Sequence, residues 1–147
     1  MMKISTKGRY GLRILADLAM YKGKSPRLIR EISQSQNLSE KYVGRLIIEL
    51  RKGGFVNSVR GAHGGYVLAK RPSEISLLDV LETMEGGISI VDCVTCPLKC
   101  RRSENCLTRG VWAVLNEKIR RTLSKMTLSN VIGEYKKSGA DFPDYCI

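Results

Sequence analysis

Four of the five cysteines in this 147-residue chain lie within a stretch of fourteen residues. They are spaced C-x2-C-x3-C-x5-C, at Cys93, Cys96, Cys100 and Cys106, with no apolar periodicity between them. Thiolate sulfur is a soft ligand, which prefers zinc or iron–sulfur clusters to magnesium or calcium. In a reducing compartment, clustered cysteines more often bind a metal than form disulfides. The spacing therefore predicts a metal or cluster site in an irregular loop, with a loop of free thiols as the alternative.

The N-terminal residues give no sign of secretion. Met1–Lys7 contains no apolar segment ahead of a small-residue cleavage site, which a secretory signal would require. The chain also lacks an apolar run long enough to cross a bilayer. We therefore expect a cytoplasmic protein without membrane association, in which the cysteines are reduced.

The net positive charge comes entirely from the first half of the chain. Residues 1–72 hold 15 lysines and arginines against 4 acidic residues, whereas residues 73–147 hold 10 of each, so the formal charge of +11 belongs to the first half. This asymmetry is typical of a polyanion-binding module joined to a neutral module with another task. A solvated basic face without a partner is the alternative interpretation. We expect double-stranded DNA as the partner of residues 1–72.

The basic half has the pattern of a helix-turn-helix. Apolar periodicity predicts three helices, at about residues 6–21, 28–34 and 40–52. Ser39 is a good N-cap for the third helix, and glycines at 53 and 54 end it. Two short helices joined by a tight turn in a basic segment predict a helix-turn-helix at about residues 28–52. The second of these helices would enter the major groove.

Polar residues beside the apolar stripe of the third helix are the predicted base readers. Arg45 can donate two hydrogen bonds to a guanine, while Lys41 and Tyr42 can reach phosphates or base edges. Gly44 is unusual, because a glycine inside a helix costs about 1 kcal/mol relative to alanine. It either permits close approach of the helix backbone to DNA or is tolerated drift, that is, a glycine that the helix accepts without any functional role.

After Gly54 the pattern changes from helical to strand-like. Two β-rich runs flank a glycine-rich tip, which predicts a hairpin over about residues 55–69. A hairpin that follows a helix-turn-helix is a wing, and Arg60 at its base is placed to enter the minor groove. The predicted DNA-binding residues are Lys7, Arg9, Ser39, Lys41, Tyr42, Arg45, Arg60, Gly64, Gly65 and Tyr66.

The second half, residues 73–147, is predicted to be a helical sensor and dimerisation region. Helices are expected at about residues 77–85, 108–125 and 127–135, with the cysteine loop at 93–106. Apolar residues of the 108–125 helix recur at steps of three and four. They either pack against the protein's own core or form the seam of a two-fold dimer, a symmetry that palindromic DNA sites require. The expected fold is mainly α with a small β-hairpin, a winged helix-turn-helix with a long dimerisation helix.

Three sequence motifs occur in order within residues 2–132. They read KISTKGRYGL at 3–12, LRKxGF at 50–55 and VRGxxGGYxL at 59–68. Together they resemble the Rrf-two family of winged-helix transcriptional regulators. The resemblance implies a dimeric transcription factor, commonly a repressor. In members with a cysteine triad it also implies an iron–sulfur cluster that tunes DNA binding, so that the protein would sense cluster, redox or cysteine status.

The resemblance also suggests cluster ligands. The family's cysteine triad falls on Cys93, Cys100 and Cys106. IscR-type members place a histidine three residues after the last of these, where this chain has Arg109, which cannot ligate iron. Cys96, a residue of a partner subunit or an exogenous thiol would then be the fourth ligand. The resemblance favours a 2Fe–2S cluster, with 4Fe–4S and a structural zinc site as alternatives.

The first motif and the wing motif are closest to CymR-type members, which lack the cysteines and govern cysteine metabolism in complex with cysteine synthase. Terminal Ile147 agrees with such a partner, because cysteine synthase accepts C-terminal isoleucine tails; an end that happens to be isoleucine is the alternative. We expect no enzyme, since the chain has no glycine-rich phosphate loop, no nucleophile motif and one histidine. A ferredoxin-type electron carrier would need no basic winged half.

Overall fold

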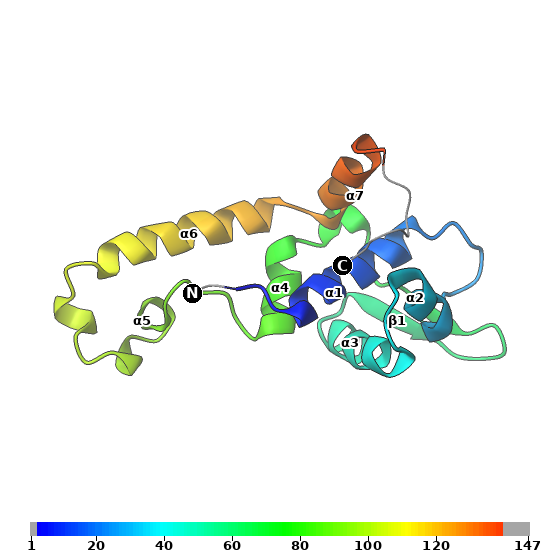
Figure 1. Cartoon of the computed structure of the whole chain (residues 1–147), viewed down its shortest axis with the longest axis horizontal. Helices are drawn as coiled ribbons and strands as arrows, with labels where there is room; N and C mark the ends of the chain where they lie inside the picture. The colour runs from blue at the N-terminus through cyan, green and yellow to red at the C-terminus, as the bar shows by residue number, and fades with distance from the viewer. Residues whose placement is uncertain (1–2, 140–147) are drawn as a thin grey trace.

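The computed structural model describes residues 3–139. The helices and strands are α1 Thr6–Met20, α2 Ile29–Gln36, α3 Glu40–Lys52, β1 Val56–Val59, β2 Gly65–Leu68, α4 Leu77–Glu85, α5 Asp92–Thr95, α6 Arg109–Lys125 and α7 Leu128–Lys137, with 3-10 turns η1 Pro72–Glu74, η2 Pro97–Lys99 and η3 Ser103–Asn105. Figure 1 shows a body made of α1 to α4, the hairpin and α7, from which α6 and α5 project as an arm. The expected fold, mainly α with a small β-hairpin, is confirmed.

Hydroxyl side chains define where most helices of the body begin. The Ser39 hydroxyl accepts a hydrogen bond from the Tyr42 amide at 3.2 Å, and Ser5, Ser76 and Thr127 cap their helices in the same way. Such caps satisfy amides that have no partner inside the helix. The predicted end of α2 was two residues short, because the helix continues to Gln36 before Asn37 turns left-handed at φ 53°.

Helix α1 runs through the middle of the body and contacts α2, α3, α4, α7 and β2. Its buried side chains include Ile14 and Leu15, and α4 adds Val80 and Met84. The predicted apolar stripe of α3 is buried against them, namely Val43, Leu46, Ile47 and Leu50. One core therefore fixes the orientation of α3 relative to every other element of the body.

The hairpin is antiparallel, with Val56 opposite Leu68 and Val59 opposite Gly65. Its outer strand β2 also pairs with the residue that precedes α2, because Arg27 and Tyr66 exchange two backbone hydrogen bonds of 2.9 and 2.8 Å. A Cβ atom at Gly65 would lie 2.7 Å from the Arg27 carbonyl oxygen. Glycine is therefore required where β2 approaches this residue.

The arm is attached to the body where α6 packs beside α4. Arg120 forms an ion pair with Glu82 of α4, and the Met126 carbonyl accepts a hydrogen bond from the Leu77 amide at 2.8 Å. The Asn116 side chain also accepts a hydrogen bond from the Ile90 amide at 3.2 Å. Asn116 is the one buried residue of α6 within the described chain. The cysteine segment contains α5, η2 and η3, so the expectation of an irregular loop was wrong.

None of the helices within residues 3–139 is long and apolar enough to span a membrane. The C-terminal tail and Ile147, to which we assigned a contact with cysteine synthase, lie outside the described residues.

Candidate nucleic-acid interface and cysteine segment

The outer face of α3 carries the predicted base readers. Lys41, Arg45 and Ile48 are exposed at spacings of four and three residues, opposite the buried stripe. Lys7 of α1 reaches the same face, since it lines a shallow hollow together with Tyr42 and Arg45. The structure thus brings Lys7 and Arg45 together from two helices, while Arg9 is exposed two residues, or about half a turn, further along α1.

Two of the predicted DNA-binding residues, Ser39 and Tyr42, also stabilise α3 within the body. Tyr42 is half-buried, and its ring packs edge-on against Tyr10 with the ring centroids 6.0 Å apart. Ser39 uses its hydroxyl as the N-cap of α3. Both residues hold the recognition helix in place, whatever contacts they make with a ligand.

The structure gives no packing reason for the glycine at position 44. A Cβ atom there would meet only the Cδ1 atom of Ile29, at 3.9 Å, which is ordinary van der Waals contact. Lys41, Arg45 and Ile48 surround Gly44 on the exposed face. Alanine would therefore fit this position within the body.

In the wing, Arg60 is exposed directly after β1, at the start of the turn between the strands and not at the base of the hairpin, where we had placed it. The other predicted wing contacts have steric roles instead of exposed side chains. A Cβ atom at Gly64 would lie 2.3 Å from the Val59 carbonyl oxygen, and Tyr66 is half-buried against the core. Gly64, Gly65 and Tyr66 therefore shape the hairpin that presents Arg60.

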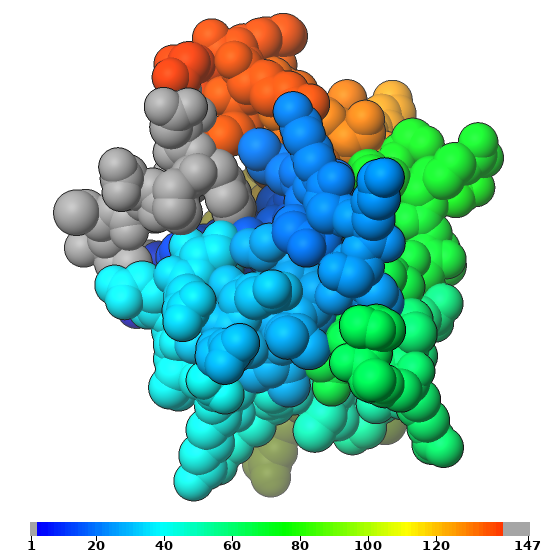
Figure 2. Space-filling view, turned by 90° about the vertical axis from the view of Figure 1, so that its right-hand side faces the viewer, coloured from blue at the N-terminus to red at the C-terminus, as the bar shows by residue number. Residues whose placement is uncertain are grey.

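Our sequence reasoning missed two further cations on this face. Arg51 and Lys52, at the exposed end of α3, line a groove with Ile48, Asn57 and Val59 between the helix and the wing. Their position directly before a predicted hairpin was the signal that could have identified them. Figure 2 shows α2, α3 and the hairpin together on one end of the body.

The four clustered cysteines are free thiols and half-exposed. Cys93 lies in α5, Cys96 follows it, and Cys100 and Cys106 follow η2 and η3. No three histidine, cysteine, aspartate or glutamate side chains within residues 3–139 are grouped closely enough to hold a metal ion. The donor set suits a thiolate-held metal in its chemistry, but its present arrangement does not assemble the predicted site.

Cys106 has the most distinctive environment of the four thiols. A hydrogen bond with the Thr108 hydroxyl, 3.5 Å away, lowers its pKa, and the Thr108 and Arg109 amides add to the effect. The Arg109 charge contributes least, and its guanidinium also donates to the Ser103 carbonyl at 3.4 Å. For Cys106, hydrogen bonding is the stronger cause.

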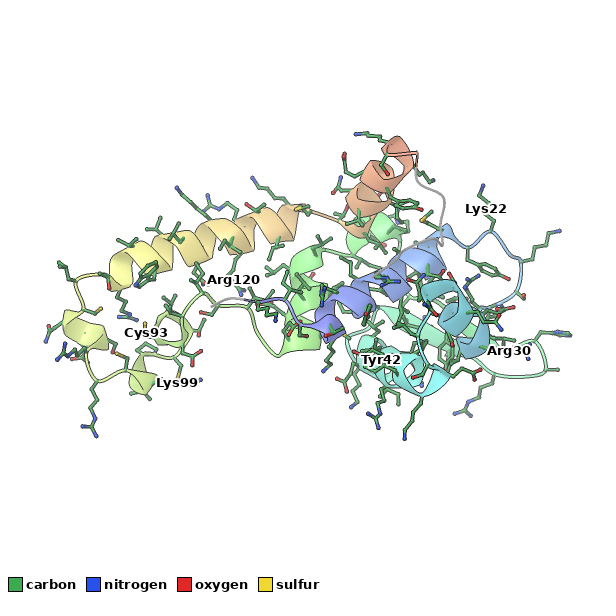
Figure 3. All side chains as sticks on the ribbon, viewed as in Figure 1. Lys22, Arg30, Tyr42, Cys93, Lys99 and Arg120 are labelled. Atoms are coloured by element: carbon green, nitrogen blue, oxygen red, sulfur yellow. The ribbon has the colours of Figure 1, made fainter. Side chains whose placement is uncertain are left out.

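The exposed face of α3 that carries Lys41, Arg45 and Ile48 (the reading face) and the cysteine segment lie at opposite ends of the molecule (Figure 3). Figure 3 places Tyr42 and Arg30 on the body, whereas Cys93 and Lys99 lie on the arm. Lys99 pairs with Asp92 at 3.3 Å beside the cysteines.

The family model described as "Rrf2: Iron-dependent Transcriptional regulator" matches residues 4–134. The chain belongs to the Rrf2 family. It is 39% identical to the regulator CymR of Bacillus subtilis over 88% of this chain and 89% of CymR, and 35% identical to the regulator IscR of Serratia proteamaculans over 89% and 79%. The solved structure of B. subtilis CymR has a TM-score of 0.74 to this Rrf2 protein at 37% identity, covering 91% of this chain and 98% of that one.

These findings confirm the family inferred from the three motifs. The relatives are helix-turn-helix transcriptional regulators, so this Rrf2 protein is a DNA-binding transcriptional regulator and not an enzyme.

Proposed function

We propose that this Rrf2 protein is a homodimeric repressor that binds a palindromic double-stranded operator. The observation that carries the proposal is the exposed basic face of α3, where Lys41 and Arg45 lie opposite the buried apolar stripe. A two-fold dimer would present two such faces to half-sites about 34 Å apart, or a multiple of that spacing.

The proposed contacts divide between the two grooves and the phosphates. Arg45 donates to a guanine in the major groove, and Lys41 binds a phosphate or a base edge. Arg60 enters the minor groove from the wing. Lys7 and Arg9 neutralise phosphates beside α3. The residues that hold this arrangement and add backbone or hydroxyl contacts are Ser39, Tyr42, Gly64, Gly65 and Tyr66.

Selection of bound duplexes from a random pool tests this part of the proposal. The enriched sequences should contain an inverted repeat, because each protomer of the dimer would bind one half-site. Enrichment of a single, non-repeated half-site would contradict the dimeric arrangement, and an absence of enrichment would contradict specific readout.

The apolar side of α6 supports the proposed dimer. Val111, Trp112, Val114 and Leu115 are all exposed, with 57% of Val111 accessible to solvent. A run of exposed apolar residues on one helix is typical of an interface and costly to leave in water. Leu115→Glu should therefore yield monomers in sedimentation experiments, whereas Ser124→Glu, at an exposed position on the opposite side of the same helix, should leave the dimer intact.

We further propose that residues 73–147 form a sensor region in which Cys93, Cys100 and Cys106 hold an iron–sulfur cluster, with Cys96 as the candidate fourth ligand. The four soft donors within one short segment support this assignment. When bound, such a group supplies an iron centre that responds to oxidants, nitric oxide or iron supply. Because the thiols are not gathered in the described chain, loading would require α5, η2 and η3 to close around the group.

Metal analysis of protein purified without oxygen tests the sensor. Iron with acid-labile sulfide is the expected result, and its spectrum should separate the favoured 2Fe–2S form from 4Fe–4S. Cys93→Ala, Cys100→Ala and Cys106→Ala should each remove the visible absorption, whereas Cys146→Ala, outside the segment, should retain it. Zinc without sulfide would indicate a structural zinc site instead, and protein without any metal would exclude the sensor.

Similarity to B. subtilis CymR favours a second candidate function. The structure of that relative is described as the global cysteine regulator, which points to control of cysteine metabolism. In this version the chain would act together with cysteine synthase, which would bind the tail that ends in Ile147. Calorimetric titration with cysteine synthase should then give binding that is lost on deletion of Ile147. Equal binding of both forms would contradict this contact.

A further inference from the structure

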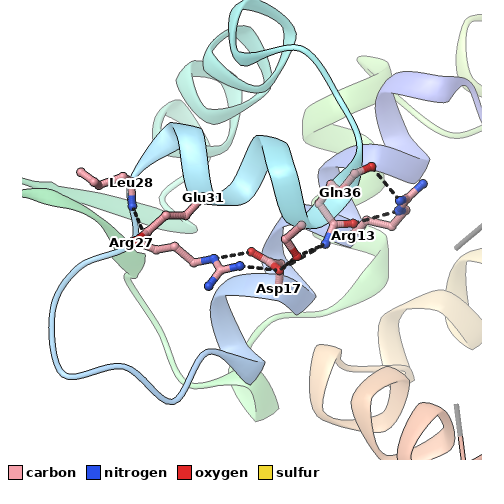
Figure 4. A network of polar contacts seen from close by, with 7 residues as sticks. Arg13, Asp17, Arg27, Leu28, Glu31 and Gln36 are labelled. Carbon is pink, nitrogen blue, oxygen red and sulfur yellow. Dashed lines mark hydrogen bonds and ion pairs between the residues drawn. The ribbon is translucent and has the colours of Figure 1, made fainter. Parts of the chain in front are cut away.

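A buried carboxylate joins α1 to the residue that precedes α2. The Asp17 side chain is 2% exposed, and its Oδ2 atom lies 2.7 Å from Nε of Arg27. The Arg27 Nη2 atom also donates to Asp17 Oδ1 at 3.2 Å, so the guanidinium contacts both carboxylate oxygens (Figure 4). Contact with both oxygens restricts the relative orientation of the two side chains as well as their distance.

The same carboxylate holds α2. Its Oδ1 atom accepts hydrogen bonds from the Ser35 hydroxyl at 2.5 Å and from the side-chain Nε2 atom of Gln36 at 3.2 Å. Arg13, one turn earlier on α1, donates to the Gln36 side chain and to its carbonyl at 3.0 and 3.1 Å. Hydrogen bonds that join Asp17 and Arg13 to the C-terminal end of α2 thus connect helices α1 and α2 (Figure 4).

Arg27 extends this network to the wing. Its backbone exchanges two hydrogen bonds with Tyr66 of β2, and its guanidinium stacks over the Tyr21 ring with 4.6 Å between the guanidinium carbon and the ring centroid. Outside the hairpin itself, Arg27 is the residue with which β2 pairs in the described chain. Arg27 therefore helps to position the outer strand, together with the packing of Tyr66 and Leu68 against the core.

We propose that Asp17 and Arg27 are positioning residues for the wing, which place Arg60 at the distance from Arg45 that one DNA site requires. The inference rests on the proposed function of Arg60 and goes beyond it by naming what sets its place. A buried ion pair contributes little net stability compared with apolar residues of similar volume. Its retention in a small domain therefore points to geometry as its contribution.

A double-mutant cycle on operator affinity tests the proposal. In the wild type, Arg60→Ala should weaken binding about 5- to 150-fold, the range for a lost specific contact. In an Asp17→Asn/Arg27→Met background the wing is no longer fixed, so Arg60→Ala should change affinity by about twofold or less, which reflects loss of the coupled contact. Both charges are removed together, which avoids leaving one buried without a partner.

Two comparisons separate positioning from a general loss of structure. Arg45→Ala should cost the same factor in both backgrounds, because the apolar core holds α3. Ser35→Ala removes one hydrogen bond to Asp17 without touching Arg27, so the full Arg60→Ala effect should remain in that background. If Arg60→Ala costs the same factor in the wild type and in the Asp17→Asn/Arg27→Met variant, the positioning role is wrong.

Hydrogen exchange without DNA distinguishes failure of the positioning role from failure of the proposed contact between Arg60 and the minor groove. If Arg60→Ala has no effect in the wild type, the proposed minor-groove contact fails. The Tyr66 amide, which donates to the Arg27 carbonyl at 2.8 Å, should still lose protection in Asp17→Asn/Arg27→Met, while the Val43 amide of α3 stays protected. Unchanged protection of Tyr66 would overturn the positioning role independently of any DNA measurement.

Discussion

The body and the arm of this Rrf2 protein differ in which side chains they bury and which they expose. The body buries a continuous core from α1, α3, α4 and α7 and belongs largely to the half of the chain with net charge +11. The arm belongs to the half with no net charge, and α6 exposes its apolar residues instead of burying them. The body thus presents charged side chains around a buried core, whereas the arm presents apolar side chains and thiols.

The two regions meet where α6 packs beside α4. Arg120 pairs with Glu82 of α4, so α4 connects the arm to the core that orients α3. Within the described residues, α5 of the cysteine segment contacts α6, and the segment lies at the opposite end of the molecule from α3 (Figure 3). Any effect of the proposed sensor on DNA affinity must therefore pass through α6 to α4 or across the proposed dimer seam. A coupling of about 1–3 kcal/mol along such a path would change affinity about 5- to 150-fold.

The largest expected effect separates the two regions by charge. If about 6–10 phosphates are neutralised by the body, operator affinity should fall about 10³- to 10⁵-fold between 50 and 200 mM salt. Self-association through the apolar face of α6 should change far less over the same range. Fluorescence anisotropy and sedimentation measure the two quantities. An operator affinity that does not depend on salt would contradict the basic reading face.

Truncation of leucines should separate the two regions by burial. Leu50 of α3 is fully buried, so Leu50→Ala should lower the free energy of unfolding by about 2–5 kcal/mol. Leu115 of α6 is 40% exposed, so Leu115→Ala should change the unfolding of the monomer by less than about 0.5 kcal/mol. Denaturant titration at protein concentrations below self-association measures both. A large loss in Leu115→Ala would mean that α6 packs on its own body.

Local chemistry predicted most of the body. Ser39 followed by an apolar stripe determined both the start and the buried side of α3, because capping and amphipathic periodicity act within one or two turns. The end of α2 was missed by two residues, although asparagine is a common residue at the left-handed position that ends a helix, as Asn37 does here.

The long-range contacts were not predictable in this way. Nothing in the local pattern pairs Asp17 with Arg27, or makes Gly65 the point where β2 meets the carbonyl of that arginine. Cysteine spacing predicts which donors are available but not where a chain without its group places them. The cysteine spacing suggested a metal or cluster site, the apolar seam of the 108–125 helix suggested a dimer, and the resemblance to the family specified an iron–sulfur cluster. None of these hypotheses follows from the contacts of a single chain.

Removal of one positive charge from α3, and separately of one from α6, compares these two surfaces directly. Arg45→Ala on the exposed face of α3 should weaken operator binding by about 1–3 kcal/mol, the range for a specific base contact. Lys118→Ala removes the same charge from α6 and should leave operator binding within experimental error. Competition titrations at fixed salt measure both variants. Equal losses in the two variants would mean that binding depends on net charge and not on the helix face.

The smallest expected effect concerns Gly44, where stability and binding should move in opposite directions. A Cβ atom at this position meets only the Cδ1 atom of Ile29 at 3.9 Å, so Gly44→Ala should stabilise the fold by about 1 kcal/mol. The added methyl group projects from the face that carries Lys41 and Arg45, and should weaken operator binding if the helix backbone approaches DNA there. Gly133→Ala is the matched control, because that helical glycine of α7 also has open space around a Cβ atom and lies outside the reading face. Thermal unfolding should show a gain in both variants, with operator affinity reduced only in Gly44→Ala. Tight binding by Gly44→Ala would make this glycine tolerated drift, and would mean that side chains alone read the operator.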